Sequence, residues 1–305
     1  MAHVMMAPMT LAKAAAAGVA MLTATLALSA CSWRMETEPD PFRTPSEVTV
    51  LRDRVAAAEQ AVGTAAGLAS GPLADAESAA VPARLDALAG VSPTSSPRPA
   101  ADLAAAAAAA QQEALDCMAG AGEDPLAALC ASIALSHAAI AGVADPAGAR
   151  DSVVEGGLVP TADSPIDRAT VAQLALEHDK LRSLYEVIAA RAEGDERATA
   201  LLASAGERER VASLLAVPGV EYITEPVYDV PASSVTDQAA RAATALEAQR
   251  ALAERYAALL VAADPADRAW LLNSAYAAYL AAAQRGLTAS EVPALPGTEP
   301  ATAAN

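Results

Sequence analysis

The chain has 305 residues, of which 54% are hydrophobic and 3% aromatic, and its formal charge at neutral pH is −17. Alanine, the strongest helix former, dominates the apolar residues, which argues against an all-β protein or a Rossmann fold. The acidic charge repels phosphate groups, so we expect no nucleic-acid partner.

The first thirty residues have the pattern of a bacterial lipoprotein signal peptide. Lys13 is the only full charge before Cys31, an apolar run covers residues 14–27, and Leu28–Cys31 reads Leu-Ser-Ala-Cys. A charged segment, an apolar segment and small residues in this order are typical of a secretory signal. A transmembrane anchor is the alternative, but the run is short for a span of about 20 residues. We expect a signal peptide over 1–30, acylation of Cys31, and attachment to the extracytoplasmic face of the cell membrane.

A tether over residues 31–43 and an N-terminal helical domain over 44–145 are expected to follow. Thr44–Glu47 is a capping box with proline at the first helical position, and it starts a helix predicted to end near Leu68. Further helices are predicted over 82–89, over 102–118, and from 124 to about 140.

Two cysteines lie on either side of the predicted turn between the last two of these helices. Cys117 and Cys130 belong to the exported part of the chain and are even in number, so we expect a disulfide. Two free thiols are the alternative. The spacing of Cys117 and Cys130 fits no zinc motif, and His137 is the only additional ligand nearby in the sequence. A cysteine nucleophile paired with His137 is also less expected than the disulfide.

The second half reads as a separate helical domain. Residues 144–163 are rich in glycine and proline and are the expected domain boundary, and residues 288–305 are the expected flexible tail. Between them, over 164–287, helices are predicted over 164–192, 195–216, 235–263 and 264–284. Short links join the first pair and the second pair, whereas the irregular segment 219–233 separates the pairs. One long crossover between two hairpins is typical of ferritin-like bundles.

Several segments of this half carry a resemblance to a known family. They are Leu174–Arg191, Glu207–Leu215, Tyr228, Pro231, Ala245–Leu260, Arg268 and Pro293–Gly297. Together they resemble an actinobacterial ferritin-like domain family of unknown function. The resemblance implies a four-helix ferritin-like fold and brings no settled activity. We therefore expect an all-α protein in which an N-terminal helical bundle precedes a ferritin-like four-helix bundle.

The di-metal centre of ferritin-like proteins needs a Glu-x-x-His motif on two helices. The sequence contains no such motif, and alanine stands three residues before His178. We therefore expect no metal and no cofactor, and predict that Glu177, Arg208 and Glu247 form a metal-free buried polar cluster, with Arg250 as another cation within reach. His178 is then a core histidine. The alternative is a metal-dependent oxidase or metal-binding protein that uses Glu177, His178 and Glu247.

Motifs for other chemistry are absent from the sequence. It has neither a Gly-x-Ser-x-Gly elbow nor a glycine-rich phosphate loop. We expect a non-enzymatic envelope lipoprotein, anchored to the membrane by lipid, that binds or scaffolds an envelope protein or a small ligand. A carrier with an apolar cavity between its helices is a third hypothesis.

The lipidation hypothesis makes a direct prediction. Cys31→Ala removes the thiol that would be acylated, so the variant should accumulate as an unlipidated precursor. Membrane fractionation and mass spectrometry of the N-terminus measure this. Processing and acylation that persist in the variant would show that the signal has been misread.

Overall fold

The computed structural model describes residues 45–88, 102–223 and 228–298, so the predicted signal peptide, Cys31 and the tether lie outside the described residues. The chain divides into two units, 1–46 and 47–305, and every described helix belongs to the second. The described part is 72% helical, with eight α-helices and no strand. The prediction of an all-α protein is confirmed.

Four helices make up the first half of the described chain, and four the second. The first four are α2 (Glu47–Ala66), α3 (Pro72–Ala87), α4 (Leu103–Gly120) and α5 (Pro125–Ala144). The others are α6 (Arg168–Arg191), α7 (Gly194–Leu215), α8 (Gln238–Ala262) and α9 (Arg268–Ala283). Aspartates at the N-caps of α4, α5, α6 and α8 accept backbone N–H groups of the first turn, which fixes where these helices begin: Asp102, Asp124, Asp167 and Asp237.

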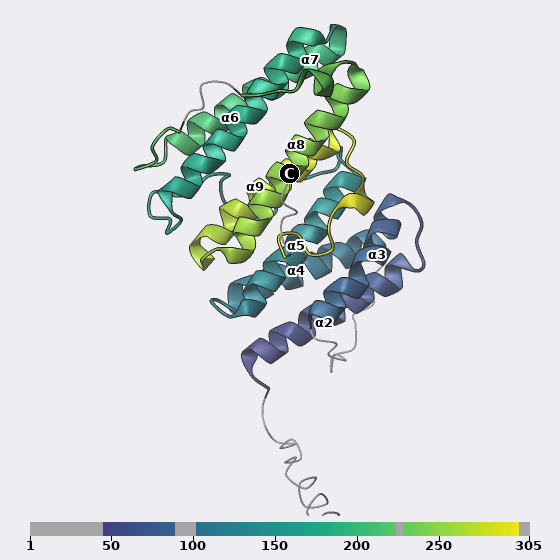
Figure 1. Cartoon of the computed structure of the whole chain (residues 1–305). Coiled ribbons are helices and arrows are strands. Elements are labelled where there is room, and N and C mark those ends of the chain that lie inside the picture. The colour runs from purple at the N-terminus through teal and green to yellow at the C-terminus, as the bar shows by residue number, and fades with distance from the viewer. Residues whose placement is uncertain (1–44, 89–101, 224–227, 299–305) are drawn as a thin grey trace, which may run out of the picture. The chain divides into compact units, whose positions relative to one another are not determined.

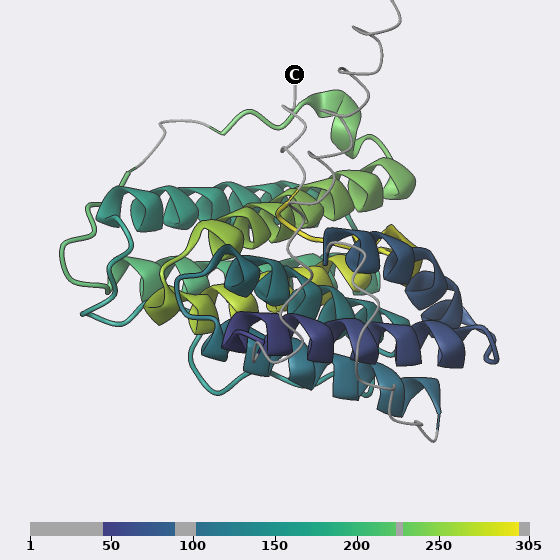
Figure 2. The ribbon, with the colours of Figure 1, turned by 90° about the horizontal axis from the view of Figure 1, so that it is seen from below.

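The helices pack as neighbouring pairs, α6 with α7, α8 with α9, and α4 with α5, while α2 packs on α3 and α4 (Figures 1 and 2). The central helix α5 also packs against α8 and α9. The two halves are in close contact at Gly142, where a Cβ atom would lie 2.8 Å from Leu280 Cδ2. Among the described helices only α5 is long and apolar enough to cross a membrane, and most of it is buried inside the protein.

The expected domain boundary at 144–163 does not separate two domains. The Asn273 side chain, on α9, accepts N–H groups of Val153 and Val154 at 3.0 and 3.2 Å and donates to the carbonyl of Val154. Ser274 donates to the carbonyl of Leu158 at 2.9 Å. The segment is therefore fixed along α9, and residues 47–305 form one compact unit where we predicted domains over 44–145 and 164–287.

The expected flexible tail also differs, because residues 293–297 form a strap bound to the first half. Ser132 and Ser136 of α5 donate to the carbonyls of Pro296 and Pro293 at 2.8 and 3.0 Å. Gly297 has a φ of +81°, and a Cβ there would lie 2.2 Å from the carbonyl oxygen of Ala257. Only glycine suits this approach of the strap to α8.

Helix α3 begins ten residues earlier than predicted. We placed a short helix over 82–89 with Pro82 near its start, whereas Pro82 lies inside α3 and Pro72 is at its start. An internal proline removes one backbone hydrogen bond, and burial of the face that includes Ala80 and Val81 offsets that loss. The longer helix places Glu77 and Arg84 two turns apart on one face.

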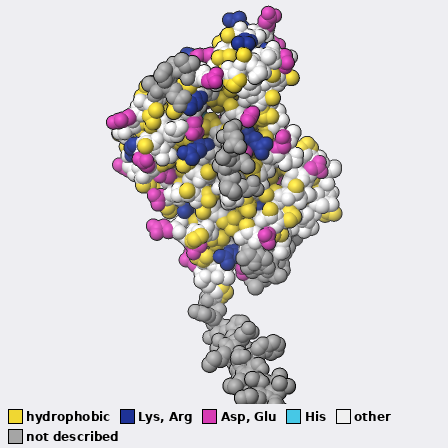
Figure 3. Space-filling model, viewed as in Figure 1, with side chains coloured by type: hydrophobic (Ala, Val, Ile, Leu, Met, Phe, Trp, Pro, Cys, Tyr) yellow, Lys and Arg dark blue, Asp and Glu magenta, His cyan; other side chains and the backbone are white. Residues whose placement is uncertain are grey.

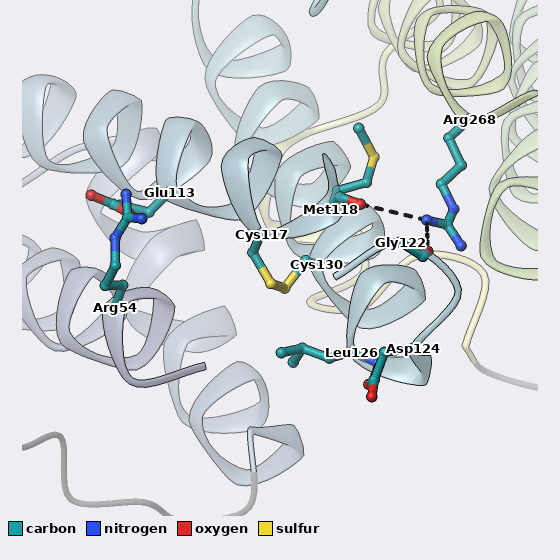
Figure 4. The surroundings of a disulfide bond; sticks show 9 residues. All are labelled: Arg54, Glu113, Cys117, Met118, Gly122, Asp124, Leu126, Cys130 and Arg268. Carbon is teal, nitrogen blue, oxygen red and sulfur yellow. Dashed lines mark hydrogen bonds and ion pairs between the residues drawn. A yellow bond between two sulfur atoms is a disulfide. The ribbon is translucent and has the colours of Figure 1, made fainter. Parts of the chain in front are cut away.

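The predicted disulfide between Cys117 and Cys130 is confirmed. It joins α4 to α5 with a Cα–Cα distance of 6.0 Å (Figure 4). Beside it, Arg268 at the start of α9 donates to the carbonyls of Met118 and Gly122 at 3.5 and 2.6 Å. The turn that the disulfide closes is thus also tied to the second half.

The described parts of the segment between α7 and α8, residues 216–223 and 228–237, contact α6 near its start and at its middle. Gly219 lies near Arg168 at the start of α6, Tyr228 donates to Asp179 at 2.5 Å, and Arg241 pairs with Glu196 at the start of α7. Helix α8 therefore begins beside the start of α7, so α7 and α8 run parallel, and α6 and α9 run opposite to them.

Candidate functional site

The polar cluster predicted from the sequence is not formed. Arg208 is 66% exposed and pairs with Glu186 at 3.2 Å, Glu177 pairs with Arg255 at 3.8 Å, and Glu247 is exposed. Arg250, the other cation considered, pairs at the surface with a neighbour on its own helix. The prediction is wrong because Arg208 and Glu247 are exposed and Glu177 pairs with Arg255 of α8, so the three side chains do not meet.

The metal-ligand set of the oxidase alternative is not assembled either. His178 is buried, as expected of a core histidine, but it lies with neither Glu177 nor Glu247. In the part of the chain that the structure describes, no group of three or more His, Cys, Asp or Glu side chains has an arrangement that could hold a metal ion.

His178 is instead the centre of a hydrogen-bonded cluster between α6, α7 and α8. Its Nδ1 lies 2.6 Å from Glu207 Oε2, and its Nε2 lies 2.8 Å from the hydroxyl of Tyr256. Gln249 Nε2 donates to Glu207 Oε1 at 2.9 Å and to the hydroxyl of Tyr185 at 3.1 Å. Since a carboxylate only accepts, Nδ1 of His178 carries a proton.

The cluster contains one carboxylate, and both of its oxygens have donors. Burial raises the pKa of Tyr256 far above its ordinary value, so its hydroxyl stays protonated. The cluster is a satisfied internal network, in which both oxygens of Glu207 and both ring nitrogens of His178 have partners.

A second polar cluster lies in the first half and is completely buried. We call it the buried quartet: Glu59 on α2, Glu77 and Arg84 on α3, and His137 on α5, all with fully buried side chains. His137 Nε2 lies 2.6 Å from Glu59, and its Nδ1 lies 2.9 Å from Glu77. Arg84 Nη1 lies 2.8 Å from Glu77 and 3.4 Å from Glu59.

The charges of the quartet balance when both carboxyls are ionised and His137 is protonated. Burial opposes the charge on each carboxyl, yet attraction to His137 and Arg84 lowers the pKa of Glu59 and of Glu77. Burial and repulsion by Arg84 oppose the imidazolium, but the two carboxylates raise the pKa of His137. We infer two negative and two positive charges, with both imidazole nitrogens donating.

The quartet also holds the C-terminal strap. Arg84 Nε donates to the carbonyl of Ala294 at 3.3 Å, and Arg84 Nη2 donates to Ser136 at 2.7 Å. Ser136 in turn donates to Pro293. One guanidinium therefore connects α3, α5 and the strap, which places the quartet in a structural role.

Sequence reasoning missed Glu59, Glu77 and Arg84. The predicted helix over 82–89 begins after Glu77 and therefore leaves it out. Glu59 lies next to an alanine of the apolar seam and has the appearance of a surface charge. The available signal was His137 on the apolar seam of α5, because a buried imidazole needs polar partners from neighbouring helices.

A large cavity lies between α6 and α8. It is a cleft of about 730 Å³, covered by residues 228–234 of the segment between α7 and α8. Its apolar lining includes Leu181 and Leu184 of α6, Ala251 and Leu252 of α8, and Val230 of the cover. We call it the α6–α8 cleft.

The cover and the rim of the α6–α8 cleft are held by polar contacts. Asp179 accepts from Tyr228 in the cover and pairs with Arg182 at 2.7 Å, and these bonds lower its pKa against the effect of burial. At the rim, burial raises the pKa of Glu177 and the nearby Arg255 opposes that rise. The cleft thus has an apolar interior and a charged rim, where Glu177 pairs with Arg255.

The molecular surface offers no basic patch for an anionic partner on the face seen in Figure 3, where acidic, basic and apolar side chains are interspersed. This agrees with the sequence charge of −17. Comparison of the chain with models of protein families, with curated proteins and with solved structures finds no match. The site must therefore be interpreted from its own geometry.

Arg84 of the buried quartet and Arg208 of the surface provide a matched pair of substitutions. Arg84→Met leaves Glu59 and Glu77 buried with one cation fewer, so we expect the free energy of unfolding to fall by about 3–5 kcal/mol. Arg208→Met removes only an exposed ion pair and should cost less than about 1 kcal/mol. Urea unfolding at neutral pH measures both. Equal losses, or a larger loss for Arg208→Met, would contradict the assignment of the quartet.

Proposed function

We propose that this protein is a lipid-anchored component of the cell envelope that binds a small, largely apolar molecule in the α6–α8 cleft and does not act as an enzyme. The single observation that carries the proposal is the cleft itself. Its volume of about 730 Å³ lies within the range of roughly 300–1,000 Å³ typical of small-molecule sites.

The chemistry of the cleft favours a ligand with an apolar body. Its interior is lined by leucine, valine, proline and alanine side chains. Two acidic residues of its lining, Glu177 and Glu254, pair with Arg255 and Arg250 of the protein. A strongly charged ligand would have to break these pairs, whereas an apolar body with one polar end would lie inside and leave the rim intact.

The cleft exists because two hairpins meet with little contact. Helices α6 and α8 touch far less than the partners within either hairpin, α6 with α7 or α8 with α9. Small side chains such as Ala248, Ala251 and Ala258 leave space where larger ones would close it. The cover over 228–234 then separates this space from solvent on one side.

We further propose that α6–α9 is a ferritin-like bundle without the metal centre. Two observations support this: the long segment that joins α7 to α8, and the parallel course of these two helices. The cluster around His178 would then occupy the middle of the bundle, where ferritin-like proteins hold metal. The resemblance to a ferritin-like domain family of unknown function agrees with this arrangement.

The location rests on the sequence before residue 45. Lys13, the apolar run and the Leu-Ser-Ala-Cys order support attachment through acyl groups on Cys31. A binding protein held at the outer face of the membrane would meet envelope components or small molecules that cross the envelope.

The binding proposal predicts that filling the cleft abolishes ligand binding. Ala251 lines the cleft, and Ala251→Trp adds an indole to the space the ligand would occupy. We expect the unlipidated chain from residue 32 to bind the neutral fluorescent probe N-phenyl-1-naphthylamine, and Ala251→Trp to bind it at least tenfold more weakly. Fluorescence titration measures the dissociation constant.

The matched control is Ala243→Trp, an exposed position on the same helix outside the cleft, which should bind the probe like the unaltered chain. Absence of probe binding by the unaltered chain, or equal binding by all three proteins, would contradict the proposal.

A further inference from the structure

A second cavity lies between α7 and α9 and is independent of the α6–α8 cleft. It has a volume of about 260 Å³. Its walls are formed by small side chains, including Ala203 of α7 and Ala277 and Ala281 of α9, while His178 and Gln249 contribute from α6 and α8. Helices α7 and α9 make almost no contact with each other, so the space between them stays open. We call it the α7–α9 cavity.

The charges that line the α7–α9 cavity are unequal. Glu207 is the only acidic residue of its lining, and its two carboxylate oxygens already accept hydrogen bonds from His178 and Gln249. Two guanidinium groups, those of Arg210 and Arg285, face the same space. The lining therefore carries one positive charge in excess, close to a carboxylate whose hydrogen bonds are satisfied.

Arg285 has unused hydrogen-bonding capacity. Its Nε atom is buried and has no hydrogen-bond partner, and its guanidinium lies over the ring of Tyr185 at 4.9 Å from the ring centroid. A buried N–H group without an acceptor is costly, and a planar guanidinium binds a carboxylate through two parallel hydrogen bonds. Stacking on Tyr185 holds the group in place for such a bond.

Arg210 marks the other end of the cavity. It donates to the carbonyl of Leu158 at 2.8 Å, which uses one of its five N–H groups. Arg210 lies close enough to Tyr256 to act electrostatically on it, and Tyr256 contacts His178. Arg285 lies over Tyr185, two helical turns further along α6, so the two arginines are at different ends of the cavity. The alanines between them can accommodate an apolar body.

We propose that the α7–α9 cavity binds a small organic carboxylate, with the carboxylate on Arg285 and its body against the alanines of α9. The volume suits a molecule smaller than a drug-sized ligand. A cation is disfavoured by both arginines, and a neutral amide would leave the guanidinium without its charged acceptor. This site shares no lining residue with the α6–α8 cleft except Leu252.

Gly206 offers a way to fill the cavity without disturbing the fold. A Cβ atom at this position would meet no heavy atom within 4 Å, and Gly206 lines the cavity. Gly206→Leu therefore places a side chain in the open space. Gly206→Ala is the matched control, because it gives the same gain in helix propensity over glycine but leaves most of the cavity empty.

The test is a calorimetric titration of the unlipidated chain from residue 32 with benzoate, and with benzamide and benzamidine as neutral and cationic analogues. We expect benzoate to bind the unaltered chain and Gly206→Ala, and to bind Gly206→Leu and Arg285→Met at least tenfold more weakly. Benzamide should bind at least tenfold more weakly than benzoate, and benzamidine should not bind.

Ala251→Trp should bind benzoate normally, which separates this proposal from the one for the α6–α8 cleft. Circular dichroism shows whether Arg285→Met is folded, and the Gly206 pair decides the outcome if it is not. The proposal is overturned if the unaltered chain does not bind benzoate, if Gly206→Leu binds it as well as Gly206→Ala, or if benzamide binds equally well.

Discussion

The buried quartet determines how the first four helices meet the C-terminal strap. Its four charges, those of Glu59, Glu77, Arg84 and His137, are buried together. Each side chain is fully buried, and the two negative and two positive charges balance one another. The quartet fixes α2, α3 and α5 to one another and binds the strap that follows α9. Because α5 also packs on α8 and α9, the second half is positioned by the same helix that supplies the histidine.

The alanine-rich composition explains both the close contacts and the cavities. Where a small residue stands on one helix, large side chains of its neighbour can pack directly against the backbone, as Leu280 and Tyr276 of α9 do at Gly142. Where the hairpins α6–α7 and α8–α9 meet, the same small residues leave space on two sides, and polar clusters hold the helices at that separation. The α6–α8 cleft and the α7–α9 cavity therefore follow from the same sequence property, with the cluster around His178 between them.

Much of the helical framework could be predicted from the sequence, because helix starts are local features. The aspartates that cap α4, α5, α6 and α8 are recognisable by their position before an apolar periodic run. The disulfide could be predicted because Cys117 and Cys130 lie on two helices joined by a short turn. The strap could not, since its partners lie more than 150 residues away in the sequence.

The polar centre of α6–α9 was predicted one or two residues from its true members. We selected Arg208 and Glu247, whereas Glu207 and Gln249 face inward. An error of one residue rotates a side chain by about 100° around a helix, which moves it from the interior to the surface. When an apolar seam consists largely of alanines, the sequence defines which side of the helix faces the interior only to within about one residue, or about 100°.

The buried carboxylates of Glu59 and Glu77 are neutralised by the side chains of Arg84 and His137. Only His137 and His178 follow the predicted cleavage site, so nitrogen NMR of histidine-labelled protein from residue 32 gives two assignable imidazoles. We predict that both nitrogens of His137 are protonated at neutral pH and that the signals of both histidines are unchanged by iron(II) or manganese(II). An unprotonated nitrogen on His137, or stoichiometric loss of either signal on addition of metal, would contradict the claim.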